Sequence, residues 1–158
     1  MFSEVKRGTT FRIHLPVTPD EIKPVPETAT MDADQRGQET ILLVEDEPAL
    51  LEVTRMMLEL RGYTVFAAQT PGEAILLAEA HSAEIDLVLT DVIMSEMSGP
   101  DLVCQLRSAH SNFRYLLMSG YTASENLAPG LLGADLPLLP KPFSSKALSA
   151  KVREVLDG

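Results

Sequence analysis

The chain has 158 residues, of which 45% are hydrophobic and 23% charged, a composition that favours one globular domain with a short additional segment. Its 13 basic and 23 acidic residues give a net charge of −10, which argues against a nucleic-acid partner, because a phosphate backbone is bound by clustered Lys and Arg. No apolar run reaches the roughly 18 residues of a membrane span, so we expect no direct membrane contact, and the single cysteine, Cys104, excludes an internal disulfide and fits a cytoplasmic location.

The first 38 residues differ in composition from the rest of the chain. Phe11, Ile13 and Leu15 alternate with polar residues, which is the pattern of a half-buried strand. The stretch that follows, residues 16–37, contains four prolines and no aromatic residue, and buries too little apolar surface to offset the entropy of ordering. These patterns divide the chain into the end of a separate domain, a flexible linker and a main domain, at residues 1–16, 17–38 and 39–158.

From Thr40 onward, patterns typical of strands alternate with patterns typical of helices. The first strand pattern, Ile41–Val44, is continuously apolar, as is typical of a parallel strand covered on both faces. Helix starts are marked by Pro48, by Thr70 followed by proline, and by Ser144. The sequence predicts five strands, at residues 41–44, 63–67, 85–90, 114–118 and 136–139. It predicts five helices, at residues 48–62, after 70, after 99, within 123–130 and after 144.

Apolar residues recur at helical spacing within these helices. In the first helix the recurring residues are Leu50, Val53, Met57 and Leu60, and Gly62 then ends the helix. In the last helix we expect a set of apolar residues to face the core: Ala147, Leu148, Val152 and Val155, with Leu156 beside them. We also expect Cys104, in the third helix, to be buried as a small apolar residue.

Five strand–helix units in about 120 residues predict an α/β fold with a doubly wound, five-stranded parallel sheet and helices on both faces. In such sheets ligands bind beyond the carboxyl ends of the strands. The residues at those ends are the acidic run Glu45-Asp46-Glu47, then Asp91, Ser119 and Lys141. We therefore expect acidic side chains, a hydroxyl and an ammonium group to meet at one edge of the sheet.

These residue types suit a phosphoryl group held together with a divalent cation. Two like charges 4 Å apart repel by about 4 kcal/mol at an effective dielectric constant near 20, so the carboxylates need a compensating charge. Mg²⁺ binds to one or two carboxylates together with water and phosphate oxygens. In this interpretation Asp91 is the nucleophile and becomes an aspartyl phosphate, while Lys141 and Ser119 contact phosphoryl oxygens.

Residues 39–158 resemble the receiver domain of two-component response regulators. The resemblance lies in four ordered stretches, at residues 41–48, 87–94, 118–121 and 141–143. It implies a flavodoxin-like receiver fold with strand order 2-1-3-4-5 and a cis bond between Lys141 and Pro142. It also implies specific roles for the residues at the strand ends: Asp91 as phosphoacceptor, Ser119 as switch hydroxyl, Lys141 as the invariant lysine, and a magnesium site made from Asp46, Asp91, the backbone carbonyl of Ile93 and, through water, Glu45.

The resemblance also implies a function. A receiver of this kind takes a phosphoryl group from the phosphohistidine of a histidine kinase or phosphotransfer protein onto Asp91, with Mg²⁺, and later hydrolyses it. Residues 8–16 resemble the end of a histidine-kinase ATPase domain. The two resemblances together suggest that the chain is the C-terminal part of a hybrid sensor histidine kinase.

Departures from the family pattern leave an alternative open. Ser95 stands where a proline is common, and Leu138 occupies the position of an aromatic switch residue. A degenerate receiver that acts as a phosphorylation-independent protein-docking module is therefore the second hypothesis. A phosphatase of the dehalogenase type is disfavoured, because Ile93 stands where that class needs a second Asp. We expect Ile93 and Tyr121 to slow hydrolysis of the aspartyl phosphate, because bulky side chains there flank the route of the attacking water.

Overall fold

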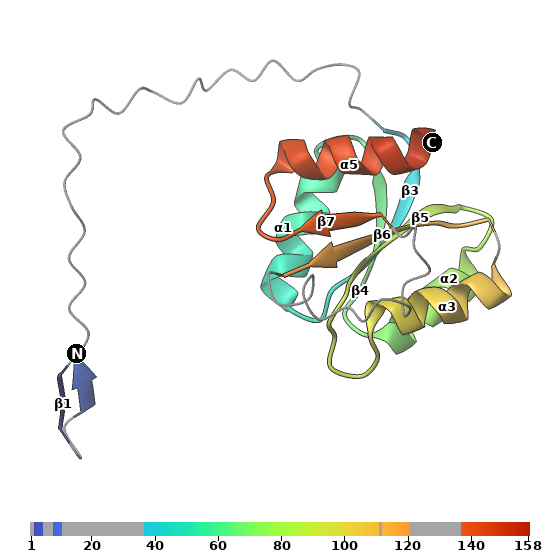
Figure 1. The fold of residues 1–158 in the computed structure, drawn as a ribbon. Coiled ribbons are helices and arrows are strands. Elements are labelled where there is room, and N and C mark those ends of the chain that lie inside the picture. The colour runs from blue at the N-terminus through green and yellow to red at the C-terminus, as the bar shows by residue number, and fades with distance from the viewer. Residues whose placement is uncertain (1, 5–7, 11–36, 111, 121–136) are drawn as a thin grey trace, which may run out of the picture. The chain divides into compact units, whose positions relative to one another are not determined.

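The computed structural model describes residues 2–4, 8–10, 37–110, 112–120 and 137–158 (Figure 1). The chain divides into two units, Met1–Thr30 and Met31–Gly158. In the first unit, β1 (Phe2–Glu4) pairs antiparallel with β2 (Gly8–Thr10). β2 ends just before the residues on which the predicted N-terminal strand rests, so this pairing does not test that prediction. Phe11, Ile13 and Leu15, residues 17–36 of the predicted linker and the predicted helix within 123–130 lie outside the described residues. Gly37, which the prediction placed in the flexible linker, is buried.

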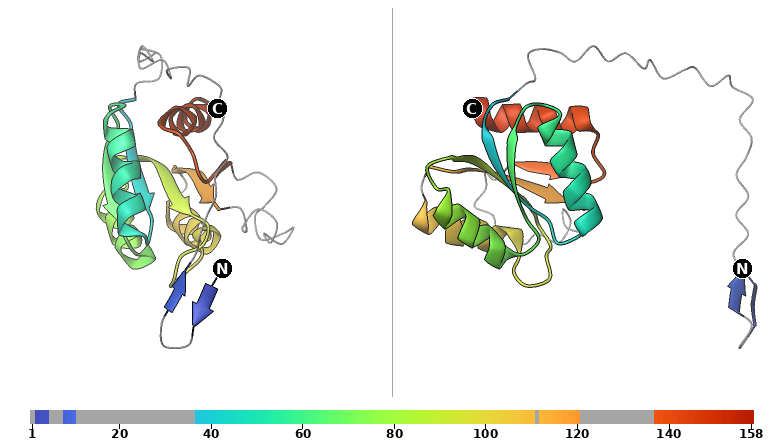
Figure 2. Two further views of the ribbon diagram at one scale, coloured as in Figure 1. Left: turned by 90° about the vertical axis from the view of Figure 1, so that its left-hand side faces the viewer. Right: turned by 180° about the vertical axis from the view of Figure 1, so that it is seen from behind.

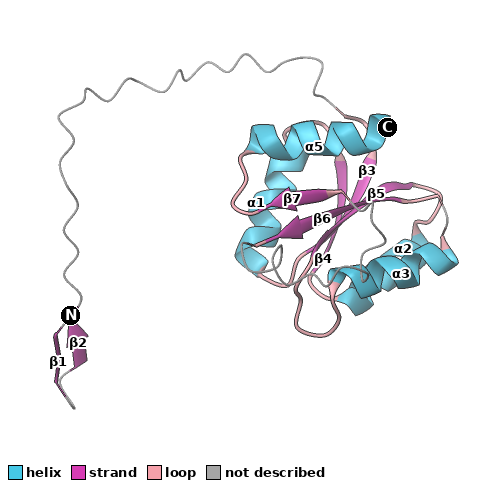
Figure 3. Cartoon of the chain, viewed as in Figure 1, coloured by secondary structure: helices cyan, strands magenta, loops and turns pink. Residues whose placement is uncertain are grey.

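The second unit alternates strands and helices, and Figure 3 shows the helices packed around a sheet. Its strands form one parallel sheet in the order β4-β3-β5-β6-β7, which is the predicted order 2-1-3-4-5 counted along this unit. The described elements are Thr40–Val44 (β3), Pro48–Glu59 (α1), Thr64–Ala68 (β4), Pro71–Ala80 (α2), Ile85–Asp91 (β5), Gly99–Ala109 (α3), Arg114–Ser119 (β6), Leu138–Pro140 (β7) and Ser145–Asp157 (α5).

Two apolar layers cover the two faces of this sheet. Strands alternate their side chains between faces, so Leu42 and Val44 pack with α2 and α3, whereas Ile41 and Leu43 pack with α1 and α5. Figure 2 shows the same arrangement from two further directions, with the sheet lying between the helix pairs. All four residues are completely buried, as expected for a strand covered on both sides.

Local signals predicted the helix starts correctly. The Thr70 hydroxyl oxygen accepts a hydrogen bond from the Glu73 backbone N–H at 3.1 Å, and the Ser144 hydroxyl accepts one from the Ala147 N–H at 3.2 Å. These side chains satisfy backbone donors that have no partner within the helix. The Lys141–Pro142 bond is cis, as the resemblance implies. The last strand, Leu138–Pro140, shares residues 138 and 139 with the predicted strand at 136–139, of which residue 136 lies outside the described residues.

The sequence patterns did not predict which side of each helix faces the core. The α1 residues that face the core are Leu51, Thr54 and Leu58, whereas Val53 and Leu60 of the predicted apolar stripe are exposed. An α-helix can carry two adjacent apolar stripes one residue apart, and periodicity alone does not decide which one is buried. Two other predictions were wrong: Ala147 is exposed while Ser149 is buried, and Cys104 is exposed.

The start of the second unit is held tightly against its surroundings. The Gly37 N–H donates to the Arg61 carbonyl at 3.0 Å, and a Cβ at Gly37 would overlap the Tyr63 ring. Gly62 has a φ of 95°, and a Cβ there would lie 2.6 Å from the Gly37 carbonyl oxygen. Both positions therefore require glycine for close approach or for backbone geometry.

An ion pair fixes the same region to the last helix. Arg153 of α5 contacts both carboxylate oxygens of Glu39, at 2.6 and 3.3 Å, and also lies over the ring of Tyr63. Partial burial acts to raise the pKa of Glu39, but the hydrogen bonds from Arg153 and the backbone outweigh it, so this pKa lies below its usual value. Among the described helices, none combines the length and the apolar character needed to cross a membrane.

Candidate functional site

Polar side chains from three different strands meet at the carboxyl edge of the sheet. Glu45 follows β3, Asp91 ends β5, and Lys141 follows β7. The Lys141 Nζ lies 2.7 Å from Glu45 Oε2 and 2.8 Å from Asp91 Oδ2. The lysine therefore bridges two carboxylates that belong to distant parts of the chain.

A third carboxylate joins this cluster. Glu45, Asp46 and Asp91 each place one carboxylate oxygen within 4.8 Å of the other two. Asp46 Oδ2 accepts a hydrogen bond from the backbone N–H of Ser95 at 3.0 Å. Glu45 is 1% exposed, so its charge has little access to water. The convergence that strand order predicts is thus present for Glu45, Asp46, Asp91 and Lys141.

The burial of the cluster changes the proton affinity of its members. Burial raises the pKa of Glu45 above its usual value, and the ion pair with Lys141 offsets only part of that rise. Burial acts to lower the pKa of Lys141, but hydrogen bonds to Asp91 and Glu45 outweigh it, so this pKa lies above its usual value. The ammonium group therefore stays charged at neutral pH.

The donor set fits a hard divalent cation. Three carboxylates face one ammonium group, which leaves about two negative charges without a compensating charge inside the cluster. All the available donor atoms are oxygens, which Mg²⁺ and Ca²⁺ prefer. A divalent cation would supply the missing charge, which is the physical reason to expect a metal at this place.

Two further predicted site residues, Ser119 and Ile93, lie beside the cluster in the chain segments that carry it. Ser119 ends β6 and is 2% exposed, and its hydroxyl donates to the Gly120 carbonyl oxygen at 3.1 Å. Its backbone carbonyl accepts a hydrogen bond from the Lys141 N–H at 2.7 Å, which holds it beside the cluster. Ile93 lies in the loop after β5, two residues beyond Asp91, with its side chain 61% exposed.

Sequence reasoning missed two residues that position Asp91. Gly99, read only as part of a helix start, packs so closely that a Cβ there would overlap the Asp91 carbonyl oxygen. Thr90 is buried, and its hydroxyl donates to the same carbonyl oxygen at 3.1 Å. The sequence did contain a signal for Gly99. The first position of a helix does not require glycine, so a glycine there can indicate close packing against a neighbouring segment.

Known proteins share both the sequence and the fold. Residues 41–153 match the family described as response regulator receiver domain. The chain is 41% identical to the sensor kinase CckA of Brucella abortus (strain 2308) over 166 residues, which cover 98% of this chain and 17% of that protein. It is thus similar to a small part of a much longer relative.

Solved structures agree with this similarity. The crystal structure of the receiver domain from the hybrid histidine kinase CckA covers 74% of this chain and 98% of its own, with a TM-score of 0.62 and 32% identity. A response regulator receiver domain protein from Clostridium thermocellum covers 75% of this chain and 94% of its own, with a TM-score of 0.69 and 23% identity. The second likeness supports the fold alone.

Proposed function

Because the chain belongs to the response regulator receiver domain family, we propose that it accepts a phosphoryl group from a phosphohistidine onto Asp91. A carboxylate oxygen of Asp91 attacks phosphorus, the new O–P bond forms as the P–N bond breaks, and the imidazole nitrogen keeps the electron pair of that bond. Water later attacks the aspartyl phosphate and restores the carboxylate.

The bridge made by Lys141 carries this proposal. Its Nζ lies 2.8 Å from Asp91 Oδ2, so a phosphoryl group on Asp91 would meet an ammonium charge at once. Such a charge, fixed before the reaction, stabilises the charge that develops on the phosphoryl oxygens. The Ser119 hydroxyl, now bonded to Gly120, would turn toward another phosphoryl oxygen.

The chain's own oxygens would hold the metal ion. Asp46 and Asp91 would bind Mg²⁺ directly, the backbone carbonyl of Ile93 would add a ligand, and Glu45 would act through water. Mg²⁺, when bound, supplies positive charge that neutralises phosphoryl oxygens during transfer. The Ser95 N–H keeps the Asp46 carboxylate facing the cluster.

The test is a mass measurement with a small phosphodonor. Wild type, Asp91→Asn and the control Asp101→Asn are incubated with acetyl phosphate and Mg²⁺. We expect a gain of about 80 Da, one phosphoryl unit, in wild type and control only, and its loss when a chelator removes the metal. An equal gain in Asp91→Asn would overturn the assignment of the phosphoacceptor.

The proposal extends to the protein that contains this chain. The similarity to CckA covers 98% of the chain and therefore extends over most of residues 1–38. This supports residues 1–16 as the end of a histidine-kinase ATPase domain, 17–38 as a linker and 39–158 as the receiver of a cytoplasmic hybrid kinase. Its partners would then be a histidine kinase or a phosphotransfer protein. Transfer from autophosphorylated Brucella abortus CckA, with the part that matches residues 39–158 deleted, tests this.

A docking module without phosphorylation is the second candidate. The Ser119 hydroxyl is engaged with Gly120, and Leu138 in β7 lacks the ring of an aromatic switch, both of which favour it. Beryllofluoride with Mg²⁺ mimics the phosphorylated state and discriminates the two candidates. A wide change in the amide NMR spectrum supports the phosphorylated switch, whereas an unchanged spectrum supports the docking module.

A further inference from the structure

The loop that follows β5, residues 92–98, has a fixed base. The Val92 N–H donates to the Met118 carbonyl oxygen at 2.9 Å, and the Val92 carbonyl oxygen accepts a hydrogen bond from the Gly99 N–H, also at 2.9 Å. The Met94 side chain is buried and so holds the first half of the loop against the core. The base of the loop therefore has a defined position relative to the end of β5.

The middle of this loop is bonded to the segment that follows β3. The Ser95 backbone N–H donates to Asp46 Oδ2 at 3.0 Å, although the two residues are 49 positions apart in the chain. The proposed cation ligands lie on both sides of this bond, because Asp46 belongs to one segment and the Ile93 carbonyl to the other. One backbone hydrogen bond thus joins the two segments that would share the cation.

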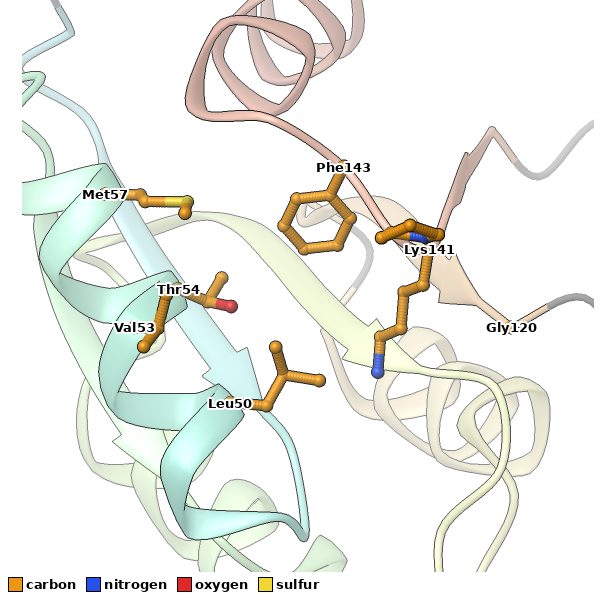
Figure 4. Close-up of a pocket in the computed structure, with 8 residues that line it drawn as sticks. Leu50, Val53, Thr54, Met57, Gly120, Lys141 and Phe143 are labelled. Carbon is orange, nitrogen blue, oxygen red and sulfur yellow. The ribbon is translucent and has the colours of Figure 1, made fainter. Parts of the chain in front are cut away.

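Asp46 differs from the other two carboxylates of the cluster in the group that holds it. The Lys141 ammonium group bonds to Glu45 and Asp91, at 2.7 and 2.8 Å, and Figure 4 shows its Nζ directed toward the end of β5. Asp46 receives its hydrogen bond from Ser95 instead. A carboxylate has about four lone-pair positions on two oxygens, so the bond to Oδ2 fixes the direction of the group and leaves Oδ1 available to a cation.

Ser95 stands at the position where a proline is common in receiver domains. A proline has no backbone N–H and could not make the bond to Asp46. The departure from the family pattern therefore adds a contact to the proposed cation site of this chain. Hydrogen bonds to a ligating carboxylate orient it, and their loss typically weakens metal binding by roughly ten- to hundredfold.

We propose that the Ser95 N–H is a positioning group for the divalent cation and that it makes the site selective for Mg²⁺ over Ca²⁺. The bond limits the movement of Asp46 relative to the loop. Such a limit matters more for Mg²⁺, which demands near-ideal octahedral geometry, than for Ca²⁺, which accepts variable geometry and longer bonds to oxygen. Ser95 acts through Asp46 and does not itself touch the cation. This inference rests on the proposed function at Asp91.

The test compares Ser95→Pro, which removes the N–H, with Ser95→Ala, which keeps the N–H and removes the hydroxyl. Mg²⁺ alone, and separately Ca²⁺ alone, is titrated into each protein without a phosphodonor, and Kd is obtained from amide NMR shifts. We expect Ser95→Pro to raise Kd for Mg²⁺ by about tenfold and Kd for Ca²⁺ by about threefold or less. Ser95→Ala should keep both Kd values within about twofold of wild type.

A second measurement uses wild type and does not depend on the folding of the proline variant, which thermal unfolding without metal checks. Hydrogen exchange of the Ser95 amide is followed with and without saturating Mg²⁺. We expect this amide to exchange at least about tenfold more slowly than in the unfolded chain under both conditions, because its N–H stays bonded to Asp46. An unprotected Ser95 amide under either condition overturns the proposed role.

The outcomes separate this inference from the proposed function. Equal Kd values for Mg²⁺ in wild type and Ser95→Pro, or an equal defect in Ser95→Ala, overturn the role of the N–H. An equal rise of Kd for Mg²⁺ and Ca²⁺ overturns the selectivity. Absence of Mg²⁺ binding to wild type overturns both this inference and the cation site. The expected Kd values together with no labelling of Asp91 by acetyl phosphate would overturn the proposed function and support the role of Ser95.

Discussion

Lys141 Nζ and Asp91 Oδ2 lie 2.8 Å apart, although the two residues are separated by 50 positions in the chain. The same ammonium group lies 2.7 Å from the carboxylate of Glu45, which is almost completely buried. One side chain thus compensates two carboxylates, and its removal affects both the stability and the chemistry of the site.

Replacing Lys141 should leave a buried charge without a partner. Lys141→Met is expected to lower the free energy of unfolding by about 2 kcal/mol at pH 7, because Glu45 then lacks its cation. Burial already raises the pKa of Glu45, so its protonation favours the folded state, and the deficit should shrink as pH falls toward the usual pKa of a glutamate. Urea denaturation at several pH values measures this.

The matched control is the double variant Lys141→Met with Glu45→Gln. It removes the buried charge together with its partner, so most of the lost stability should return. A double variant as unstable as Lys141→Met would show that the defect arises elsewhere.

Gly99 should tolerate no side chain, since a Cβ there overlaps the Asp91 carbonyl oxygen. Gly99→Ala is expected to cost about 2 kcal/mol of stability and to slow labelling by acetyl phosphate, because the end of β5 must shift. Gly72→Ala is the control, since the nearest atom to a Cβ there is the Thr70 hydroxyl oxygen at 3.9 Å. That variant should gain about 0.5 kcal/mol from helix propensity. Thermal unfolding and labelling rates on both variants are the measurements, and equal effects would refute the explanation.

The ion pair between Glu39 and Arg153 should make stability depend on pH. Because the pKa of Glu39 lies below its usual value, the folded state gains from its ionised form. That gain is present above the usual pKa of a glutamate and is lost as pH falls through the lowered pKa. Glu39→Gln is therefore expected to cost about 1 kcal/mol at pH 7 and progressively less in acid. Chemical denaturation of both proteins between pH 7 and pH 3 gives the comparison, and a constant difference across that range would contradict it.

Ile93 should slow loss of the phosphoryl group. Its exposed apolar side chain stands two residues after Asp91, where it would hinder an approaching water. Ile93→Asn is expected to accelerate dephosphorylation severalfold, because a shorter polar side chain admits and orients water. Leu76→Asn on α2 controls for the loss of an exposed apolar residue. The rate is followed by the decay of the added mass after the phosphodonor is removed, and an unchanged rate in Ile93→Asn would dismiss the effect.

Much of the fold was predictable because its signals are local. Thr70 and Ser144 mark helix starts through hydrogen bonds to residues three positions away, so the sequence around them contains the whole interaction. The continuous apolar run at residues 41–44 likewise indicates a strand covered on both faces. Strand ends then placed the acidic residues and the lysine at one edge, which is where the structure has them.

Other features depended on contacts between distant residues. Periodicity showed that α1 is a helix but not whether Val53 or Thr54 faces the core, because its rotation is set by the sheet and α5 packed against it. The same limit explains the wrong expectation for Ala147.

Sequence patterns were sufficient to predict which chemical groups are available and which strand ends they follow, because those properties are local. Packing between distant segments was needed to show that Lys141 bridges Glu45 and Asp91 and that Gly99 packs against Asp91. The same is true of Thr54, which is buried and whose hydroxyl has no hydrogen-bond partner among the described residues. Those relationships arise from strand register and helix rotation, which minimise the free energy of the whole packed core rather than of any one segment.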